Sequence, residues 1–565
     1  MDKQQLRTQA KLAAADFLEN EKEYQMGYVG AEQPHPLTRE LSQTYQRSAQ
    51  EGVRLLFQVD EQMADRAAAT LTTPAYADFA DTIRRTLQKG GKVIFSGCGS
   101  SGRLSMNLER SWRSAVAKLS SRYPQAAPAL ADALERVGNI MTGGDYAVIR
   151  AAESFEDSTA LGKAQARQWH LQAGDLLVGI TATGETTSIL GTALQALEDG
   201  AEVYMLICSD PQPLLHKMER VQAVYRHPNC RVLSLDCGPM ALTGSTRMQS
   251  STYEQFAACV ALEGALYDLL TACGEATAFP GYGWYGQQFR NMVRQLLGDE
   301  ATSLLAKATL TEQNVYEQGG RITLFADDYL LDVLTDTTER APTFMTPPFC
   351  SADMVGQPQS WAFVKNPTCN TQTAWERCFL RSPRCIEWER AFYEQLGLNA
   401  RQIEKIPDIS GKALQRYLIG NEPMLQRENA PHSHALWVDV NAAPADFQNA
   451  AASYTAYSSL TVREVAVTLA ETFTDMFEHL CLKLMLNVLS TGVMARMGRI
   501  HGNWMTCLAM SNKKLVDRSA RIIVDQCGIA YETALEELYY AKAVMEAEGV
   551  NRSPAQEVIR KFGAK

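Results

Sequence analysis

The sequence predicts an α/β protein in which parallel sheets are flanked by helices, as in a doubly wound or flavodoxin-like fold. From about residue 75, short apolar runs alternate with helix-length segments, which is the sequence pattern of βαβ units. Most of the runs end in loops that contain glycine or serine, where the chain can turn into a helix. The predicted strands are residues 92–95, 138–142, 176–181, 202–208, 232–235, 320–325 and 435–440.

The two ends of the chain predict helices without strands. Residues 1–70 carry Leu and Ala at helical spacing, with an interruption around residues 27–36. Residues 465–497 and 516–547 contain long helical patterns. We therefore expect a mostly helical N-terminal segment and a C-terminal helical cap.

Composition argues against several classes of function. A net charge of −10 and a pI near 5.5 disfavour non-specific binding to nucleic acid or to an anionic membrane surface. No apolar run approaches the roughly 18–20 residues of a membrane span, and the first residues are too polar for a signal peptide. The 13 cysteines form no CxxC pair, which favours a reduced, cytoplasmic setting.

A metal site is not expected. His432 and His434 stand just before a predicted strand, but no third ligand follows at a suitable spacing. We expect no metal and no cofactor.

The most informative stretch follows the first predicted strand, where residues 97–103 read Gly-Cys-Gly-Ser-Ser-Gly-Arg. Glycines let the backbone approach a ligand, and Gly99, Ser100 and Ser101 would offer N–H and hydroxyl donors at a helix N-terminus, which favours an anion. A tight turn without a ligand remains an alternative. A dinucleotide is disfavoured, since no acidic residue about 20 positions on ends a second strand.

Two further loops follow later strands. The first offers Thr181, Thr183, Gly184, Glu185 and Thr186, and the second is residues 243–248 with Arg247. The carboxyl ends of parallel strands share one edge of a sheet, so all three loops should converge and favour a small phosphorylated ligand. Thr and Ser also cap helices without any ligand, and Arg247 is either a charge clamp or a solvated arginine. The Glu185 carboxylate would repel phosphate unless it points away, so we expect its backbone N–H to matter more.

Four stretches in order resemble one family. Residues 97–103 resemble the first loop of sugar isomerase (SIS) domains, and more narrowly those of N-acetylmuramic acid 6-phosphate etherases and glucokinase regulatory protein. Residues 143–158 resemble the family's GGEYA…EGxED segment, residues 243–248 match its TGSTRM signature, and residues 489–515 resemble its C-terminal block. Residues 35–41 are similar to the regulatory protein's NPLTRDL. One departure is Gln249, where a lysine usually follows TGSTRM.

The resemblance implies two SIS domains in tandem, as in the regulatory protein. We expect a helical segment at residues 1–60, SIS domain 1 with the phosphate loops at 61–285, SIS domain 2 with degenerate loops at 286–500, and the cap at 501–565. Aligning Gly97 with Phe325 puts strand on strand, and the second half then lacks the glycine loop. The family's catalytic glutamate in its LDASE stretch falls on Ser111 in the first half and on Glu339 in the second.

The first half keeps the glycine loop and the second half keeps the glutamate. This complementarity predicts a pseudo-dimer within one chain, so a monomer is possible. One composite site would survive, with loops from the first half and Glu339 from the second. The alternative for Glu339 is a surface carboxylate. The resemblance also implies that Lys514 points at the ligand from the C-terminal block, and that Glu153 and Glu339 form the carboxylate pair.

The resemblance leaves the function open. We favour a regulatory protein that binds a fructose phosphate or amino-sugar phosphate without turnover, with a sugar kinase as a possible partner. The alternative is an etherase, a carbon–oxygen lyase that releases lactate with Glu153 and Glu339 as catalytic acid and base. Aldose–ketose isomerase activity is a third, less supported possibility. A glutamate that binds hydroxyls and one that moves protons look alike in sequence.

Overall fold

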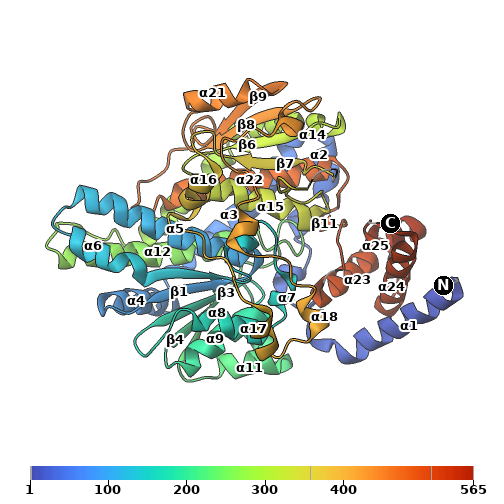
Figure 1. The fold of residues 1–565 in the computed structure, drawn as a ribbon, viewed down its shortest axis with the longest axis horizontal. Coiled ribbons are helices and arrows are strands. Elements are labelled where there is room, and N and C mark those ends of the chain that lie inside the picture. The colour runs from blue at the N-terminus through green and yellow to red at the C-terminus, as the bar shows by residue number, and fades with distance from the viewer. Residues whose placement is uncertain (1–2, 355, 357, 511, 551, 564–565) are drawn as a thin grey trace.

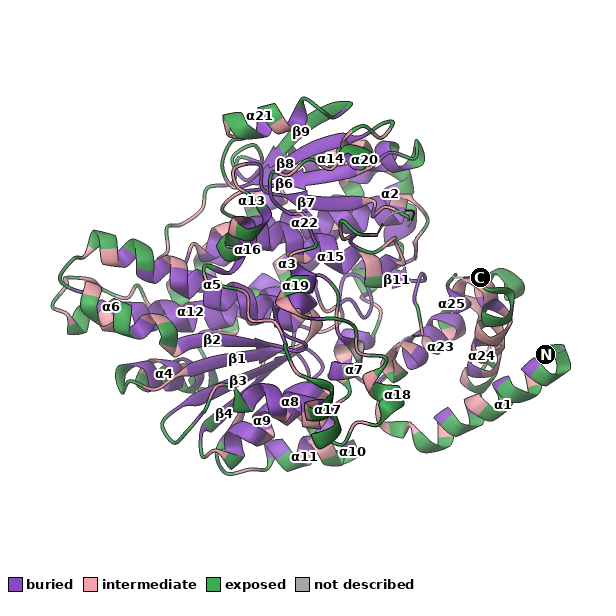
Figure 2. Cartoon of the chain, in the orientation of Figure 1, coloured by how far each residue is buried: buried purple, intermediate pink, exposed green. Residues whose placement is uncertain are grey.

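Two parallel sheets form the body of the molecule, with helices between and around them (Figure 1). The computed structural model describes residues 3–354, 356, 358–510, 512–550 and 552–563, and the side chains of residues 153 and 154 lie outside that description. Figure 2 shows that the strands of both sheets are largely buried. The predicted α/β class with parallel sheets is confirmed.

The first sheet has five parallel strands in the order β2-β1-β3-β4-β5. The chain leaves β1 in the direction of β2 and returns to β3 on the other side, which places a switch point between β1 and β3. Helices α4 (Pro74–Gln88), α5 (Gly99–Arg122), α8 (Thr159–Arg167), α9 (Thr187–Glu198) and α12 (Gln249–Ala272) flank it. Its strands are β1 (Val93–Gly97), β2 (Val137–Met141), β3 (Leu176–Thr181), β4 (Glu202–Ile207) and β5 (Cys230–Ser234).

The second sheet has four parallel strands in the order β7-β6-β8-β9, which repeats the order of the first four strands of the first sheet. Helices α14 (Asp299–Glu317), α15 (Leu330–Phe344) and α22 (Met476–Arg496) lie beside it. Gly97 ends β1 and Phe325 ends β6, as the alignment of the two halves predicts. The strands are β6 (Ile322–Phe325), β7 (Ala362–Lys365), β8 (His434–Asp439) and β9 (Ala456–Thr461).

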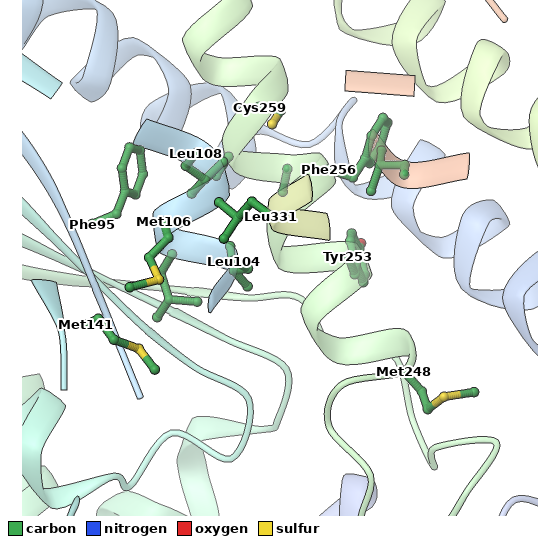
Figure 3. Close-up of a cluster of buried hydrophobic side chains, with 14 of the residues drawn as sticks. Phe95, Leu104, Met106, Leu108, Met141, Met248, Tyr253, Phe256, Cys259 and Leu331 are labelled. Atoms are coloured by element: carbon green, nitrogen blue, oxygen red, sulfur yellow. The ribbon is translucent and has the colours of Figure 1, made fainter. Parts of the chain in front are cut away.

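The two halves share one apolar core. Leu331 of α15 lies among Leu104 and Leu108 of α5 and Cys259 of α12 (Figure 3), and all of these side chains are almost fully buried. Burying such side chains stabilises by roughly 1.5–3 kcal/mol each, so the halves are held together by the same force that holds each half. Helices α5 and α15 therefore face each other across the interface.

A helical layer at one end joins the two ends of the chain. Helix α1 (Lys3–Asn20) packs against α24 (Tyr531–Glu548), next to α23 (Lys513–Cys527) and α25 (Pro554–Phe562), and N and C lie close together in Figure 1. Phe17 belongs to the same small core as Ile523 and Leu538. The N-terminal helix thus completes the predicted cap.

Further helices complete the chain between these elements. They are α2 (Leu41–Arg47), α3 (Ala49–Thr70), α6 (Ala127–Ala133), α7 (Glu153–Glu156), α10 (Pro211–Lys217), α11 (Glu219–Tyr225), α13 (Tyr282–Leu296), α16 (Thr371–Phe379), α17 (Arg390–Gln395), α18 (Ala400–Ile403), α19 (Gly411–Leu414), α20 (Leu425–Glu428) and α21 (Ala445–Ala451). Short strands β10 (Ile500–His501) and β11 (Trp504–Met505) form an antiparallel pair. None of the helices in the described ranges could cross a bilayer.

Three details differ from the sequence-based expectation. Strands β7 and β9 were not predicted: β7 has only four residues, and β9 lacks a continuous apolar run. Residues 465–475 are not helical: residues 465 and 466 lie in a turn where Ala466 has a φ of 55°, residues 467–472 have no regular structure, and α22 begins only at Met476. The predicted helix at residues 516–547 is broken, since Gly528 adopts a left-handed φ of 67° between α23 and α24.

Candidate functional site

A cavity of about 260 Å³ lies where the loops after β1 and β3 meet α15 and α23. The loops of the first half converge there, as the rule for open parallel sheets predicts. The predicted site residues that line the cavity are Gly99, Ser100, Ser101, Thr181, Thr183, Thr186, Arg247, Glu339 and Lys514.

The first loop turns so tightly that its glycine cannot be replaced. A Cβ atom on Gly97 would lie 2.3 Å from the backbone oxygen of Ser101, which no side chain tolerates. Gly99 has a φ of 55° and is the first residue of α5. The N–H groups of residues 99–101 belong to the first turn of that 24-residue helix, where they have no partner within the helix and favour an anion.

Glu254 lies beneath this loop. Its Oε2 accepts a hydrogen bond of 3.2 Å from the Ser101 hydroxyl. Burial raises the pKa of Glu254 well above its usual range and so favours the neutral carboxyl group. This reduces the repulsion that Glu254 would exert on an anion bound at the loop.

The second loop presents threonine hydroxyls to the cavity. Thr181 and Thr186 share a hydrogen bond of 2.8 Å between their hydroxyls. Gly184 has a φ of 85°, and its carbonyl accepts a hydrogen bond of 2.6 Å from the Tyr225 hydroxyl. Thr181, Thr183 and Thr186 line the cavity, whereas Gly184 and Glu185 are not among the described lining residues.

Glu185 points away from the cavity and holds Lys514. Its Oε1 lies 2.6 Å from Lys514 Nζ and accepts a hydrogen bond of 3.0 Å from Thr183. Arg220 lies 3.3 Å from Oε2. Burial alone would lower the pKa of Lys514, but the carboxylates of Glu185 and Glu156 outweigh it and hold that pKa above its usual range. Lys514 is therefore a permanent cation at the cavity wall.

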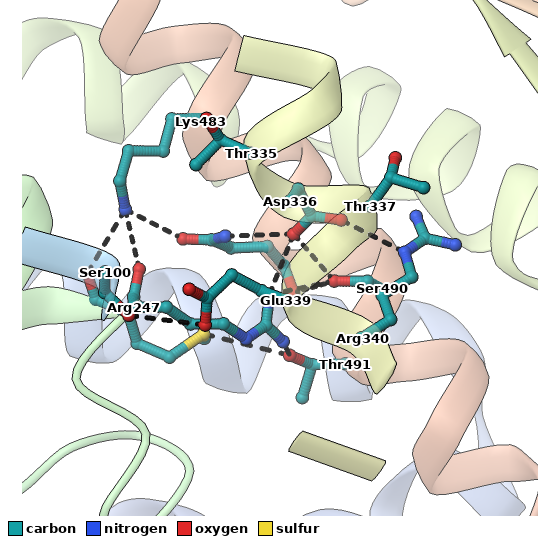
Figure 4. Close-up of polar contacts among 12 residues, drawn as sticks. Ser100, Arg247, Thr335, Asp336, Thr337, Glu339, Arg340, Lys483, Ser490 and Thr491 are labelled. Carbon is teal, nitrogen blue, oxygen red and sulfur yellow. Dashed lines mark hydrogen bonds and ion pairs between the residues drawn. The ribbon is translucent and has the colours of Figure 1, made fainter. Parts of the chain in front are cut away.

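Arg247 links the two halves (Figure 4). One guanidinium nitrogen donates to Asp336 at 2.8 Å and to Ser490 at 3.1 Å, and the other donates to Thr491 at 2.8 Å. Lys483 binds the Arg247 carbonyl at 2.7 Å. Arg247 is buried, so the solvated alternative is wrong, and the partners that it has in this structure are protein groups. Its role as a clamp for a ligand stays a prediction.

Glu339 reaches across from the second half to the first loop. Its Oε1 lies 2.5 Å from the Arg103 guanidinium, and its Oε2 accepts a hydrogen bond of 3.3 Å from Ser100. Glu339 is only 9% exposed, so it is not a surface carboxylate. The side chains of the two halves therefore meet at one cavity.

Ser111, the position in the first half that aligns with Glu339, makes no comparable contact with the loop of the other half. Ser111 is buried, and its hydroxyl has no hydrogen-bond partner among the described residues. The loop that it would face reads Ala326-Asp327-Asp328, and Asp327 binds Asn366 at 2.8 Å and Arg377 at 3.1 Å. Carboxylates bound to their own domain have replaced the serine donors there.

Several lining residues were not among the predicted site residues. Glu156, Ser245 and Thr246 lie within the motifs quoted above, and the motifs were the signal that could have identified them. Arg518 follows Lys514 by one helical turn and therefore shares its face of α23. Glu32 also lines the cavity and binds Arg518 and Arg521. These residues are nearly 500 positions apart in the sequence, so no local pattern could have predicted the contact.

Glu153 is the predicted site residue whose side chain the structure does not describe. Its backbone begins α7, but its side chain lies outside the described residues. Glu156, at the other end of the same short helix, lines the cavity. Of the histidine pair, His434 places its Nε2 2.8 Å from the Ser458 hydroxyl.

Comparison with known proteins identifies relatives of the first half. The family profile of the glucokinase regulatory protein N-terminal SIS domain matches residues 77–197. The chain is 29% identical over 230 residues, 41% of its length, to an N-acetylmuramic acid 6-phosphate etherase of Pectobacterium atrosepticum, and covers 66% of that protein. It is 28% identical over 244 residues, 43% of its length, to that of Serratia proteamaculans, and covers 72%. The chain thus spans about two thirds of the length of these relatives.

A similar solved structure is the putative tagatose-6-phosphate ketose/aldose isomerase from Clostridium novyi. It has a TM-score of 0.42 and 9% identity, and the match covers 81% of this chain and 92% of that one.

The parallel sheets, the loops at their carboxyl ends and the profile match identify a sugar isomerase (SIS) domain that includes residues 77–197. In sequence the chain is similar to glucokinase regulatory protein over this domain and to the N-acetylmuramic acid 6-phosphate etherases over about two fifths of its length.

Proposed function

We propose that the chain binds a phosphorylated sugar in the cavity between its two halves. The observation that carries this proposal is the hydrogen bond between Glu339 of the second half and Ser100 in the first turn of α5. It brings a carboxylate to the edge of an anion-binding loop. A ligand with a phosphate at one end and hydroxyl groups at the other fits that pair of chemistries.

The phosphate end would rest on the first half. The N–H groups at the start of α5, the hydroxyls of Ser100, Ser101 and Thr183, and the Lys514 ammonium group are all donors suited to a charged acceptor. Glu185 supports this end indirectly, because it fixes Lys514 without entering the cavity.

The sugar end would rest on Glu339 and Glu156. The Glu339 carboxylate, fixed between Arg103 and Ser100, presents acceptor oxygens to the hydroxyl groups of a sugar. A carboxylate held by two protein donors suits binding without turnover, as expected of a regulatory protein. A sugar kinase as its partner stays a prediction from the family resemblance.

A second candidate is a carbon–oxygen lyase of the etherase type. Two carboxylates, Glu156 and Glu339, line one cavity, and general acid–base chemistry needs such a pair. The curated relatives named above are etherases by name. The family resemblance assigns the second carboxylate to Glu153, which stays a prediction, and Glu156 is a further carboxylate on the same helix.

Calorimetry and thermal shift with fructose 1-phosphate, fructose 6-phosphate, N-acetylglucosamine 6-phosphate and N-acetylmuramic acid 6-phosphate test the binding proposal. A ligand at 100 times its Kd should stabilise the protein by about 2.7 kcal/mol. Lys514→Gln should weaken binding about tenfold or more, because it removes a charge-assisted hydrogen bond. Lys513→Gln is the matched control, since Lys513 is half exposed and pairs with Glu21 at 2.7 Å. No shift with any of the four ligands would refute the proposal.

Release of lactate from N-acetylmuramic acid 6-phosphate separates the two candidates. Binding without turnover predicts no lactate above the buffer rate. Lactate formation that Glu339→Gln, Glu153→Gln or Glu156→Gln abolishes would establish the lyase instead.

A further inference from the structure

A long arm of the second half lies over the first half. We define the arm as residues 380–414, between α16 and the end of α19. Arg381, only 9% exposed in its side chain, binds Asp145 at 2.5 Å and Asn139 at 3.0 Å. The arm is therefore anchored on the segment that follows β2.

Backbone contacts continue this attachment. The Asp145 N–H donates to the Arg384 carbonyl at 3.0 Å, and the Arg384 N–H donates back to the Asp145 carboxylate at 2.5 Å. Gly144 has a φ of 73°, and a Cβ there would lie 3.2 Å from the Arg384 carbonyl oxygen. A glycine is needed at this position for the arm to come so close.

The far part of the arm packs on α7. The Trp388 ring stacks on Phe155 with 6.0 Å between centroids and 26° between planes. Tyr393 meets the same Phe155 ring edge-on at 6.4 Å, and also packs on Trp388. Phe155 is fully buried, and the arm supplies aromatic walls for it.

Helix α7 depends on such support because it is short. It has four residues and no side-chain cap at its N-terminus, and a helix of that length is not stable by itself. Glu156 directly follows Phe155 and lines the cavity. What fixes the Phe155 ring therefore also fixes the position of the Glu156 carboxylate.

We propose that Trp388 is a positioning residue for the sugar end of the site, acting through Phe155 on α7 and Glu156. This rests on the proposed binding of a phosphorylated sugar. The second half then contributes twice to the site, directly through Glu339 and indirectly through the arm. The donors at the phosphate end lie on α5, the β3 loop and α23, so the arm bears on the sugar rather than on the phosphate.

The test compares two ligands on the full chain. Trp388→Ala should weaken binding of the best sugar phosphate about tenfold, while the Kd of inorganic phosphate stays within twofold of the unaltered protein. Trp388→Phe keeps a ring on Phe155 and should recover most of the affinity. Trp169→Ala is the matched control, because Trp169 contacts the arm at Arg384, with 4.7 Å from the guanidinium to its ring, away from α7. It should leave both affinities unchanged.

Hydrogen exchange gives a reading that needs no ligand. In Trp388→Ala, amides of residues 152–158 should exchange at least tenfold faster, while those of residues 98–104 keep their rates. Unchanged exchange at residues 152–158 would overturn the proposal, and so would equal weakening of both ligands. If the unaltered protein binds no sugar phosphate but Trp388→Ala still speeds exchange at residues 152–158, the result supports the arm's role and rejects the proposed ligand.

Discussion

The two halves of the chain share a strand order but differ at the loop after their first equivalent strand. In the first half, Gly97 leads into serines and the start of α5, whereas in the second half Phe325 leads into Ala326 and two aspartates. The facing helices differ in the opposite sense, with Ser111 on α5 and Glu339 on α15. Each half keeps a component that the other has lost, and the surviving components meet at one cavity.

This difference shows what a tandem repeat can discard. In a symmetric pair, each loop would face a glutamate of the other half. Here one such arrangement remains, and the other has become ordinary packing, with the Arg110 guanidinium bound to the Asp328 carbonyl. The interface must still hold both halves in register, since a shift of α15 would remove Glu339 from Ser100.

The largest expected effect comes from removing the link between the halves. Arg247→Ala should lower the free energy of unfolding by about 3 kcal/mol, since it leaves the buried Asp336 short of a charge partner. Arg294→Ala is the control, because its pair with Glu61 is half exposed, and it should cost less than about 0.5 kcal/mol. Urea denaturation measures both. Equal losses would mean that Arg247 does not couple the halves.

The next effect tests the two unlike loops. Gly97→Ala should cost about 2 kcal/mol and reduce sugar phosphate binding below detection, because the new Cβ would meet the Ser101 backbone. Phe325→Leu, at the matching position of the second half, should cost about 1 kcal/mol through packing and leave binding unchanged. Thermal unfolding with and without ligand measures both. A loss of binding in Phe325→Leu would show that the second loop still takes part.

A smaller effect is the pH dependence of stability that a buried carboxyl group of the first half causes. Burial raises the pKa of Asp60 to about 7, and Gln249 donates to it at 2.7 Å. Between about pH 4 and pH 7 the unfolded chain has released this proton while the folded chain keeps it, so stability falls as pH rises through that window. Asp60→Asn should remove about 1.4 kcal/mol per pH unit from the slope there. Urea unfolding at pH 5, 6 and 7 measures it, and an unchanged slope would contradict the assignment.

The sequence predicted the loops because their chemistry is local. Gly97, Ser100 and Thr183 lie at strand-to-helix connections whose need for glycine and hydroxyl residues is visible within a few positions. Glu339 was predicted by comparing the halves, since α5 and α15 keep their register. The arm and Glu32 could not be predicted, because Trp388 and Arg518 meet their partners only through tertiary packing across hundreds of residues.

The missed strands have a similar explanation. β9 reads Ala-Tyr-Ser-Ser-Leu-Thr, and its first residues are largely exposed at the edge of the second sheet, so it lacks the apolar run of a buried strand. β7 has four residues and follows a segment of irregular structure. Because two of its four strands were missed, the strand order of the second sheet could be recognised only from the structure.

The composite site is tested most directly by calorimetry on Glu339→Gln and Ser111→Ala with the same sugar phosphate. We predict that Glu339→Gln weakens binding about tenfold, about 1.4 kcal/mol, because a neutral amide is a poorer acceptor for sugar hydroxyls. Ser111→Ala should leave the Kd within twofold, since its hydroxyl lies at the lost site. Equal affinities for the two variants, or a larger loss in Ser111→Ala, would contradict a single site built from both halves.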